Sequence, residues 1–265
     1  MLVSEVMLQQ TPVLRVIPAF TSWLQRWPDP AGLAADPPGE AVRMWGRLGY
    51  PRRALRLHAA AIAVVADHDG RLPDSHSELV ALPGIGDYTA SAVLAFAFKR
   101  RIAVLDTNVR RVLGRFLDGR ALPRSSAPSR AERDRLSAML PSDPAAAARV
   151  SEAIMELGAT VCLARTPRCE HCPVRSGCRW YAAGRPQNQH PVARQARFEG
   201  SDRQVRGLIL ALLRESDHPL PSAEIDGLWP DSHQLSRARD SLLADGLIVR
   251  AGSCFSLPLG QDAAR

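Results

Sequence analysis

Four of the five cysteines lie within one short stretch, and this clustering constrains the fold more than any other feature of the chain. They follow the spacing Cys-x6-Cys-x2-Cys-x5-Cys, at Cys162, Cys169, Cys172 and Cys178. Four thiolates this close share one centre, and a metal or cluster site in a reducing compartment suits them better than a disulfide framework. Structural zinc sites usually pair two close knuckles, and only one close pair is present here. We therefore expect a [4Fe–4S] cluster, with zinc as the alternative.

The chain ahead of the cysteines favours an α-helical fold. Small and aliphatic residues over 59–65 and 90–98 recur without the alternation typical of strands. Between these runs, residues 82–86 read Leu-Pro-Gly-Ile-Gly, which predicts a helix end, a tight turn and a new helix. Gly84 and Gly86 allow positive φ and a close approach, and the free amides of such a turn bind a phosphate without reading a base. A plain corner between two helices is the alternative.

Asp106 directly precedes a predicted helix whose apolar stripe has helical spacing. The stripe consists of Val109, Val112, Leu113 and Phe116. An aspartate in this place most often caps the helix through its side chain. The same position suits an ionised catalytic carboxylate, because the helix dipole and the backbone donors stabilise its charge. Both roles are open for Asp106.

The charge balance favours a polyanionic partner, with an ordinary basic surface as the alternative. The 265 residues include 34 lysines and arginines against 27 aspartates and glutamates, and Lys99 is the only lysine. The net charge is +7 and the isoelectric point is near 9.8. No apolar run reaches the roughly 18 residues that cross a bilayer, and no signal-like segment precedes the first predicted helix. We expect no membrane partner, and a chain that works in the cytoplasm, associated with the nucleoid.

Four motifs together resemble the adenine DNA glycosylases of the endonuclease III superfamily, a group of helix-hairpin-helix DNA repair enzymes. Residues 4–11 read Ser-Glu-Val-Met-Leu-Gln-Gln-Thr, which is close to a run typical of these glycosylases. Residues 45–50 read Trp-Gly-Arg-Leu-Gly-Tyr and resemble their Gly-Leu-Gly-Tyr segment. The glycine turn with the aspartate that follows it, and the cysteine loop, complete the likeness. It covers residues 1 to about 192.

The resemblance implies a set of catalytic residues. They are Glu5, Asp106, Tyr88 and Asn108. Glu5 would protonate the adenine, Asp106 would stabilise positive charge on the sugar and guide water, and the other two would support both. On the residues alone, a solvated glutamate is the alternative for Glu5, although its apolar neighbours would raise the pKa of its carboxyl if they desolvate it.

The resemblance also implies a set of DNA contacts. They are Gln10, Thr11, Leu48, Tyr50, Gly84 and Gly86. Gln10 and Thr11 would enter the duplex beside the flipped base. Leu48 and Tyr50 would wedge the DNA around the opposing base, because unstacking leaves a hole that must be refilled. The alternative is that Leu48 and Tyr50, with Trp45, are ordinary core residues.

The resemblance and the helical pattern together predict a mainly α fold. We expect a helix-hairpin-helix DNA glycosylase fold, which combines a six-helix barrel and an iron–sulfur cluster domain, followed by a small winged-helix-like module. The expected limits are 1–102 for the barrel domain, 103–192 for the cluster domain, 193–202 for a linker and 203–265 for the module. Helical stripes over 205–213 and 235–243, and alternation over 247–249 and 254–257, predict the module. It is too short for the larger, mostly β domain that ends many relatives.

We therefore predict a monomeric, monofunctional glycosylase of base excision repair. Its partner would be double-stranded DNA in which adenine is mispaired with 8-oxoguanine or guanine. One alternative is an endonuclease III-type glycosylase and lyase on oxidised pyrimidines, which carries a lysine where this chain has Tyr88. Another is a non-catalytic iron–sulfur regulator that binds DNA. Family members place a longer segment ahead of the glutamate, so we also expect that Met1 is a misassigned start or that the chain is truncated and impaired.

Overall fold

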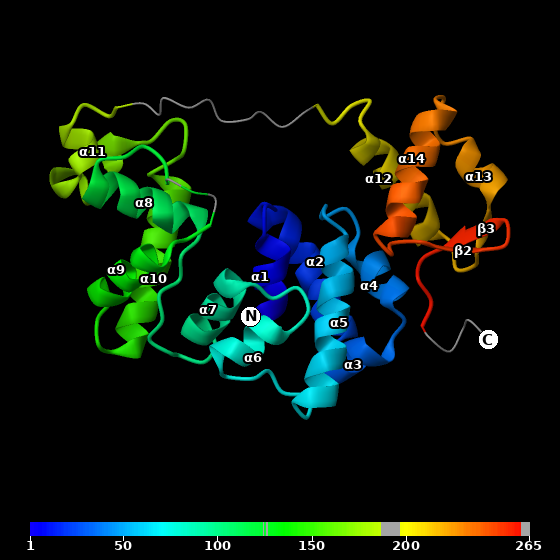
Figure 1. The fold of residues 1–265 in the computed structure, drawn as a ribbon, viewed down its shortest axis with the longest axis horizontal. Helices are drawn as coiled ribbons and strands as arrows, with labels where there is room; N and C mark the ends of the chain where they lie inside the picture. The colour runs from blue at the N-terminus through cyan, green and yellow to red at the C-terminus, as the bar shows by residue number, and fades with distance from the viewer. Residues whose placement is uncertain (124, 126, 187–196, 261–265) are drawn as a thin grey trace. The chain divides into compact units, whose positions relative to one another are not determined.

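The computed structural model describes residues 1–123, 125, 127–186 and 197–260, and contacts between residues divide it into two compact units. The central unit comprises Met1, 74–76 and 86–193. The terminal unit comprises 2–73, 77–85 and 194–265. Helices dominate both units, as expected, and the sheet lies near the carboxyl end of the chain (Figure 1).

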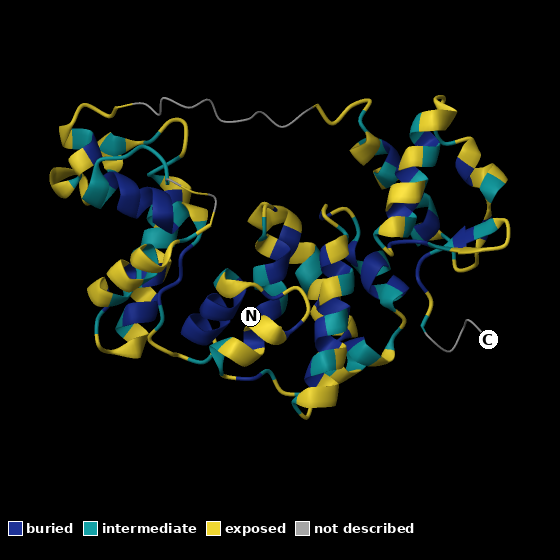
Figure 2. Cartoon of the chain, in the orientation of Figure 1, coloured by how far each residue is buried: buried dark blue, intermediate teal, exposed yellow. Residues whose placement is uncertain are grey.

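The first half of the terminal unit is a helical bundle around α5. Its helices are α1 (Leu2–Leu8), α2 (Val13–Arg26), α3 (Pro30–Ala35), α4 (Pro38–Trp45) and α5 (Arg52–Asp67). Helix α5 packs against α1, α3 and α4. Its buried and exposed residues alternate with the helical period, so that one face belongs to the core (Figure 2). Edge-to-face contacts join Trp23 to Trp27 and Trp45, with ring centroids 4.7 and 5.9 Å apart.

The second half of the terminal unit is the small module at the carboxyl end. Its elements are α12 (Asp202–Glu215), β1 (Leu220–Pro221), α13 (Ser222–Asp226), α14 (Ser232–Ala244), β2 (Val249–Ala251) and β3 (Cys254–Ser256). The strands form an antiparallel sheet in the order β1-β3-β2. This arrangement is the winged-helix-like pattern that the sequence predicts. The sequence missed β1 because two residues are too few to show alternation.

The module is bound to α4 mainly through main-chain carbonyls. Arg43 donates Nη1 to the carbonyl of Arg214 and Nη2 to that of Ser216, the latter at 2.9 Å. In return, Arg214 Nε donates to the carbonyl of Val42 at 3.0 Å. Burial, together with the charge of Arg47, lowers the pKa of Arg214 to about 10. These reciprocal bonds explain why both halves belong to one compact unit.

The central unit has two adjoining apolar cores. Its elements are α7 (Asp87–Phe96), α8 (Thr107–Asp118), α9 (Arg130–Met139), α10 (Pro144–Thr160), the short 3-10 turns η1 (Cys169–His171) and η2 (Arg175–Gly177), and α11 (Arg179–Ala182). Val109, Leu113 and Leu136 are among the residues of one core. Helix α7 supplies much of the other and is buried almost throughout (Figure 2). Helix α6 (His76–Ala81) belongs to the terminal unit except for its first residue.

The predicted linker over 193–202 is only partly visible, since residues 193–196 lie outside the described part of the chain. Helix α12 begins at its last residue. The expected domain limits at 102 and 192 stay predictions. Among the described residues, no helix is long and apolar enough to span a membrane.

Candidate active site and cysteine pocket

Asp106 caps α8, as its position predicts. Its Oδ1 accepts from the backbone N–H of Val109 at 2.6 Å, and its Oδ2 accepts from Asn108 Nδ2 at 2.9 Å. The side chain is only half-buried. Both carboxylate oxygens therefore have a donor, and the helix dipole adds to the stabilisation of negative charge at this place.

A chain of hydrogen bonds continues from this carboxylate to the first cysteine. Asn108 Oδ1 accepts from Arg111 Nη2 at 2.8 Å, and Arg111 Nε donates to the carbonyl of Cys162 at 2.7 Å. Burial lowers the pKa of Arg111, while the nearby Cys162 acts in the opposite direction. Arg111 thus joins the helix that Asp106 caps to the cysteine loop.

Gly158 makes this junction possible. Arg111 Nη2 also donates to its carbonyl, at 2.6 Å. A Cβ at this position would lie 2.6 Å from Cβ of Asn108, so only glycine lets α10 approach the start of α8 so closely. Glycine often marks the end of a helix, but α10 continues past Gly158 to Thr160.

The four cysteines line one pocket of the central unit, together with Arg115, Val161, Pro167, Arg175, Trp180 and Tyr181. Arg115 donates to Cys162 Sγ at 3.3 Å and to the carbonyls of Leu163 and Ala164 at 2.8 and 3.0 Å. Its guanidinium stacks 4.4 Å from the ring centroid of Trp180. One buried arginine therefore orders the start of the loop and donates to a thiol.

The donor set of this pocket is four thiols, with no carboxylate or imidazole among the side chains that line it. Four thiols around one pocket match a cluster in which each iron takes one cysteine.

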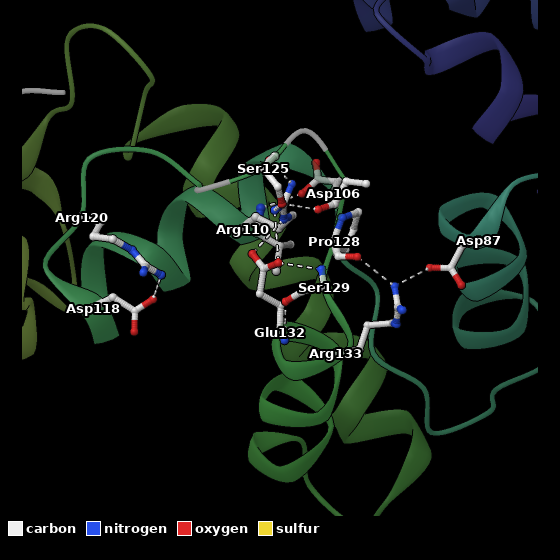
Figure 3. A network of polar contacts seen from close by, with 12 residues as sticks. Asp87, Asp106, Arg110, Asp118, Arg120, Ser125, Pro128, Ser129, Glu132 and Arg133 are labelled. Atoms are coloured by element: carbon white, nitrogen blue, oxygen red, sulfur yellow. Dashed lines mark hydrogen bonds and ion pairs between the residues drawn. The ribbon is translucent and has the colours of Figure 1, made fainter. Parts of the chain in front are cut away.

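A third arginine of α8, Arg110, holds the segment before α9. The buried Arg110 donates to both carboxylate oxygens of Glu132, at 2.9 and 3.1 Å, and to the carbonyl of Ser125 at 3.1 Å (Figure 3). Glu132 and Ser129 also form a reciprocal capping box at the start of α9. Burial acts to raise the pKa of Glu132, but the bonds from Arg110 and Ser129 outweigh it and lower it to about 2. The Ser-x-x-Glu spacing could have revealed the cap from the sequence.

The motif at the amino end lies in and after α1. Glu5 is half-buried in this helix, Gln10 is exposed with φ of 56°, and Thr11 is buried. Thr11 Oγ1 lies 3.3 Å from the carbonyl of Leu48. The structure thus brings the segment after α1 against the second predicted DNA-contacting segment.

That second segment is the turn between α4 and α5. The side chain of Tyr50 is 54% exposed and its φ is 48°, whereas Leu48 is only 6% exposed. Trp45 is fully buried and is a core residue.

The glycine turn lies between α6 and α7, as expected. Gly84 has φ of 78°, and a Cβ there would lie 2.5 Å from Cβ of Arg56. Gly86 is exposed and precedes the first residue of α7. Tyr88, in the first turn of α7, is half-buried against the core that α7 helps to form.

The predicted residues fall into two sets by compact unit. Asp106, Asn108, Tyr88, Gly86 and the cysteines belong to the central unit. Glu5, Gln10, Thr11, Leu48, Tyr50 and Gly84 belong to the terminal unit.

Comparisons with known proteins agree on one family. Residues 3–135 match the family described as "HhH-GPD superfamily base excision DNA repair protein". The chain is 48% identical to the adenine DNA glycosylase of Mycobacterium tuberculosis, over 97% of this chain and 84% of that protein. It is 49% identical to the adenine DNA glycosylase of Mycolicibacterium smegmatis, over 93% and 83% respectively. A solved thermostable thymine-DNA glycosylase superimposes with a TM-score of 0.62 at 25% identity, over 69% of this chain and 83% of that one.

Proposed function

Because this chain belongs to the HhH-GPD superfamily of base excision DNA repair proteins, we propose that it hydrolyses the N-glycosidic bond of adenine mispaired with 8-oxoguanine or guanine. The single observation that carries the proposal is the identity of nearly half, over almost the whole chain, to adenine DNA glycosylases. We also propose that the protein acts as a monomer and associates with the nucleoid.

Asp106 is the residue that we assign to the sugar. N-glycosidic cleavage builds positive charge on the sugar, and a fixed carboxylate stabilises it in the transition state. The bonds from Val109 and Asn108 hold this carboxylate in one orientation. Asn108 is in turn held by Arg111, so the carboxylate does not reorganise as charge develops.

Glu5 is the residue that we assign to the base. A protonated carboxyl can give its proton to adenine, which leaves more readily when it is protonated. Glu5 is half-buried in α1, with the buried Leu2 and Val6 near it along the helix. Tyr88 is assigned a supporting role.

Two kinds of contact would hold the duplex. The exposed amides around Gly84 and Gly86 suit a phosphate, since they precede the start of α7. Gln10 and Thr11 would enter the duplex beside the flipped adenine, and Leu48 and Tyr50 would wedge the DNA around the opposing base. Of these side chains, Tyr50 is exposed and ready to stack, whereas Leu48 would have to leave its buried position.

We assign a [4Fe–4S] cluster to the four cysteines. When bound, it would supply cross-links that keep the loop in one shape. The loop carries Arg165, Arg168, Arg175 and Arg179, all exposed and able to contact phosphates. The expected protein is brown, with about four irons per chain and no stoichiometric zinc. Cys169→Ser should lose iron and duplex binding, whereas Cys254→Ser, outside the loop, should lose neither; a zinc-loaded active protein would contradict the assignment.

The decisive experiment is a strand-nicking assay on duplexes that contain 8-oxoguanine opposite adenine. Strand breaks should appear only after alkali, because a lyase needs a positioned amine and the only lysine, Lys99, is exposed beyond the end of α7. Borohydride trapping of a covalent adduct at yields that match excision would favour the endonuclease III alternative. Binding without any excision would favour the regulator.

A further inference from the structure

Arg53 is a buried charge without an acidic partner. It lies in the first turn of α5 with 7% of its surface exposed. Among the described residues, its hydrogen bonds go to carbonyls and a hydroxyl, and no ion pair involves it. A buried arginine without an acidic partner, whose Nε also has no hydrogen-bond partner among the described residues, is costly unless its geometry serves a purpose.

One terminal nitrogen of the guanidinium binds backbone carbonyls at the carboxyl end of α1. Arg53 Nη1 donates to the carbonyl of Val6 at 2.8 Å, to that of Gln9 at 2.5 Å and, more weakly, to that of Met7 at 3.4 Å. The last carbonyls of a helix have no partner within the helix, and a cation there is favourable. Arg53 therefore fixes where the helix that carries Glu5 ends.

The other half of the guanidinium binds the following segment and the turn between α4 and α5. Arg53 Nη2 donates to Thr11 Oγ1 at 3.2 Å and to the carbonyl of Gly49 at 3.1 Å. Trp45 Nε1 donates to the same carbonyl at 2.9 Å. The guanidinium carbon lies 5.2 and 5.3 Å from the ring centroids of Trp45 and Tyr50. One side chain thus bridges two segments more than 30 residues apart in sequence.

Both bridged segments have unusual backbone. Gln10 and Tyr50 are non-glycine residues with φ of 56° and 48°, and the turn also contains Gly46 and Gly49 with φ of 55° and 83°. Left-handed backbone at non-glycine residues persists only where surrounding contacts enforce it, and it concentrates at functional sites. The hydrogen bonds and ring contacts of Arg53 are surrounding contacts that can enforce the left-handed backbone in both segments.

We propose that Arg53 is a positioning residue that locks residues 9–11 to the turn 46–50, so that both meet the duplex as one preassembled surface. The inference rests on the proposed function, which assigns Gln10, Thr11, Leu48 and Tyr50 to the mispair. The planar fork is essential, because the point charge of a lysine cannot reach carbonyls and a hydroxyl on both sides at once.

The test compares Arg53→Lys with the control Arg52→Lys, whose side chain is 54% exposed and pairs with Asp245. Binding is measured to a mispaired and to a fully matched duplex, and hydrogen exchange is measured over residues 6–11 and 46–50. In Arg53→Lys, the Kd for the mispair should rise about tenfold and that for matched duplex should stay within about twofold, because phosphate contacts remain. Exchange should quicken in both segments together. The control should change neither.

Loss of folding would be recognised separately. A lower thermal unfolding midpoint, measured by circular dichroism, identifies a destabilised protein, and the duplex affinities are compared at a temperature where variant and wild type are both folded. An equal loss on both duplexes, or quicker exchange in only one segment, would overturn the proposal. If the wild-type chain shows no preference for the mispair, the proposed function fails, and the joint change in exchange still decides whether Arg53 is a lock. Guanidinium ion at low concentration should restore slow exchange in Arg53→Ala; absence of rescue would count against the lock.

Discussion

Each compact unit buries an arginine that bonds next to one of the two assigned carboxylates in the chain, but the two arginines have different hydrogen-bond partners. In the central unit, Arg111 bonds to Asn108, which bonds to Asp106, and also to the loop that carries the cysteines. In the terminal unit, Arg53 bonds to main-chain carbonyls and Thr11 and stacks on rings. Burial lowers the pKa of both, and the charges that act in the opposite direction include Asp106 for Arg111 but only Tyr50 for Arg53.

This difference indicates two ways to hold a reacting group. Arg111 is electrostatically coupled to its carboxylate through one amide, so a change at the arginine should reach the chemistry directly. Arg53 fixes the backbone at the end of α1, the helix that carries Glu5, and in the turn 46–50. Damage to Arg111 should therefore lower the excision rate, whereas damage to Arg53 should lower discrimination between duplexes.

The strongest test replaces each carboxylate by its amide. Asp106→Asn should lower the single-turnover excision rate about 1,000-fold, because it removes stabilisation present only in the transition state. Asparagine can still accept from Val109, so mispair binding should stay within about threefold. Glu5→Gln should behave similarly, since an amide cannot deliver the proton. Equal losses of affinity and rate in Asp106→Asn would mark it as a structural cap, and full activity in Glu5→Gln would end its role as acid.

The next largest effect is expected from Arg111→Lys. A lysine cannot bond at once to Asn108 and to the carbonyl of Cys162, so the excision rate should fall about 10- to 100-fold with little change in mispair affinity. The matched control is Arg101→Lys, because Arg101 is exposed and also donates to carbonyls, those of Leu140 and Pro141 just after the end of α9. If the rate and the affinity fall together, Arg111 acts as a positioning residue like Arg53, and the two arginines do not differ in role.

A smaller effect is expected at the Arg110–Glu132 pair, which holds α9 rather than a reacting group. Glu132→Gln should lower the free energy of unfolding at pH 7 by about 2 kcal/mol, because the buried arginine loses its charged partner. The folded pKa of about 2 lies below the ordinary 4.5, so the carboxylate stabilises the fold above about pH 4.5 and loses this effect as the pH falls toward 2. The difference between variant and wild type in denaturant unfolding should therefore shrink below pH 4.5. A difference that persists at pH 2 would contradict the assignment.

The sequence predicts the motifs well because each depends on local spacing. The cap at Asp106, the corner at Gly84 and Gly86, and the common pocket of the four cysteines follow from periodicity and turn chemistry over a few residues. The module's hairpin also lies close to its predicted place.

The buried arginines could not be predicted, because their partners are distant in sequence and are mostly backbone atoms. Arg53 bonds to Val6 across 47 positions, and Arg111 to Cys162 across 51. Every residue has a main-chain carbonyl, so residue types do not reveal which carbonyls accept these bonds. The sequence therefore does not distinguish these arginines from the others among the 33 in the chain. The role of Gly158 is hidden for a related reason, since this glycine lies inside α10 and serves a close approach to Asn108 rather than a turn.

The smallest effect is expected at Arg43. Like Arg53 it binds carbonyls, but those carbonyls belong to the module and not to a segment that carries Glu5 or Asp106. Arg43→Lys should lose the bonds to Arg214 and Ser216 and lower the free energy of unfolding by about 1 kcal/mol. Hydrogen exchange should quicken around residue 214, while excision stays within about twofold of wild type. Arg53→Lys, measured alongside, should instead lower the affinity for the mispair about tenfold.

The salt dependence of duplex binding shows whether the module takes part in DNA recognition. Residues 203–265 contain seven arginines against eight aspartates and glutamates, so the net positive charge of the chain resides before the module. Arg43→Lys should therefore leave the slope of duplex affinity against salt concentration unchanged, because that slope counts phosphates neutralised elsewhere. A more than tenfold loss of excision in Arg43→Lys, or a shallower salt slope, would show that the docked module takes part in DNA recognition. Arg43 would then belong with Arg53, as a second lock on the surface that meets the duplex.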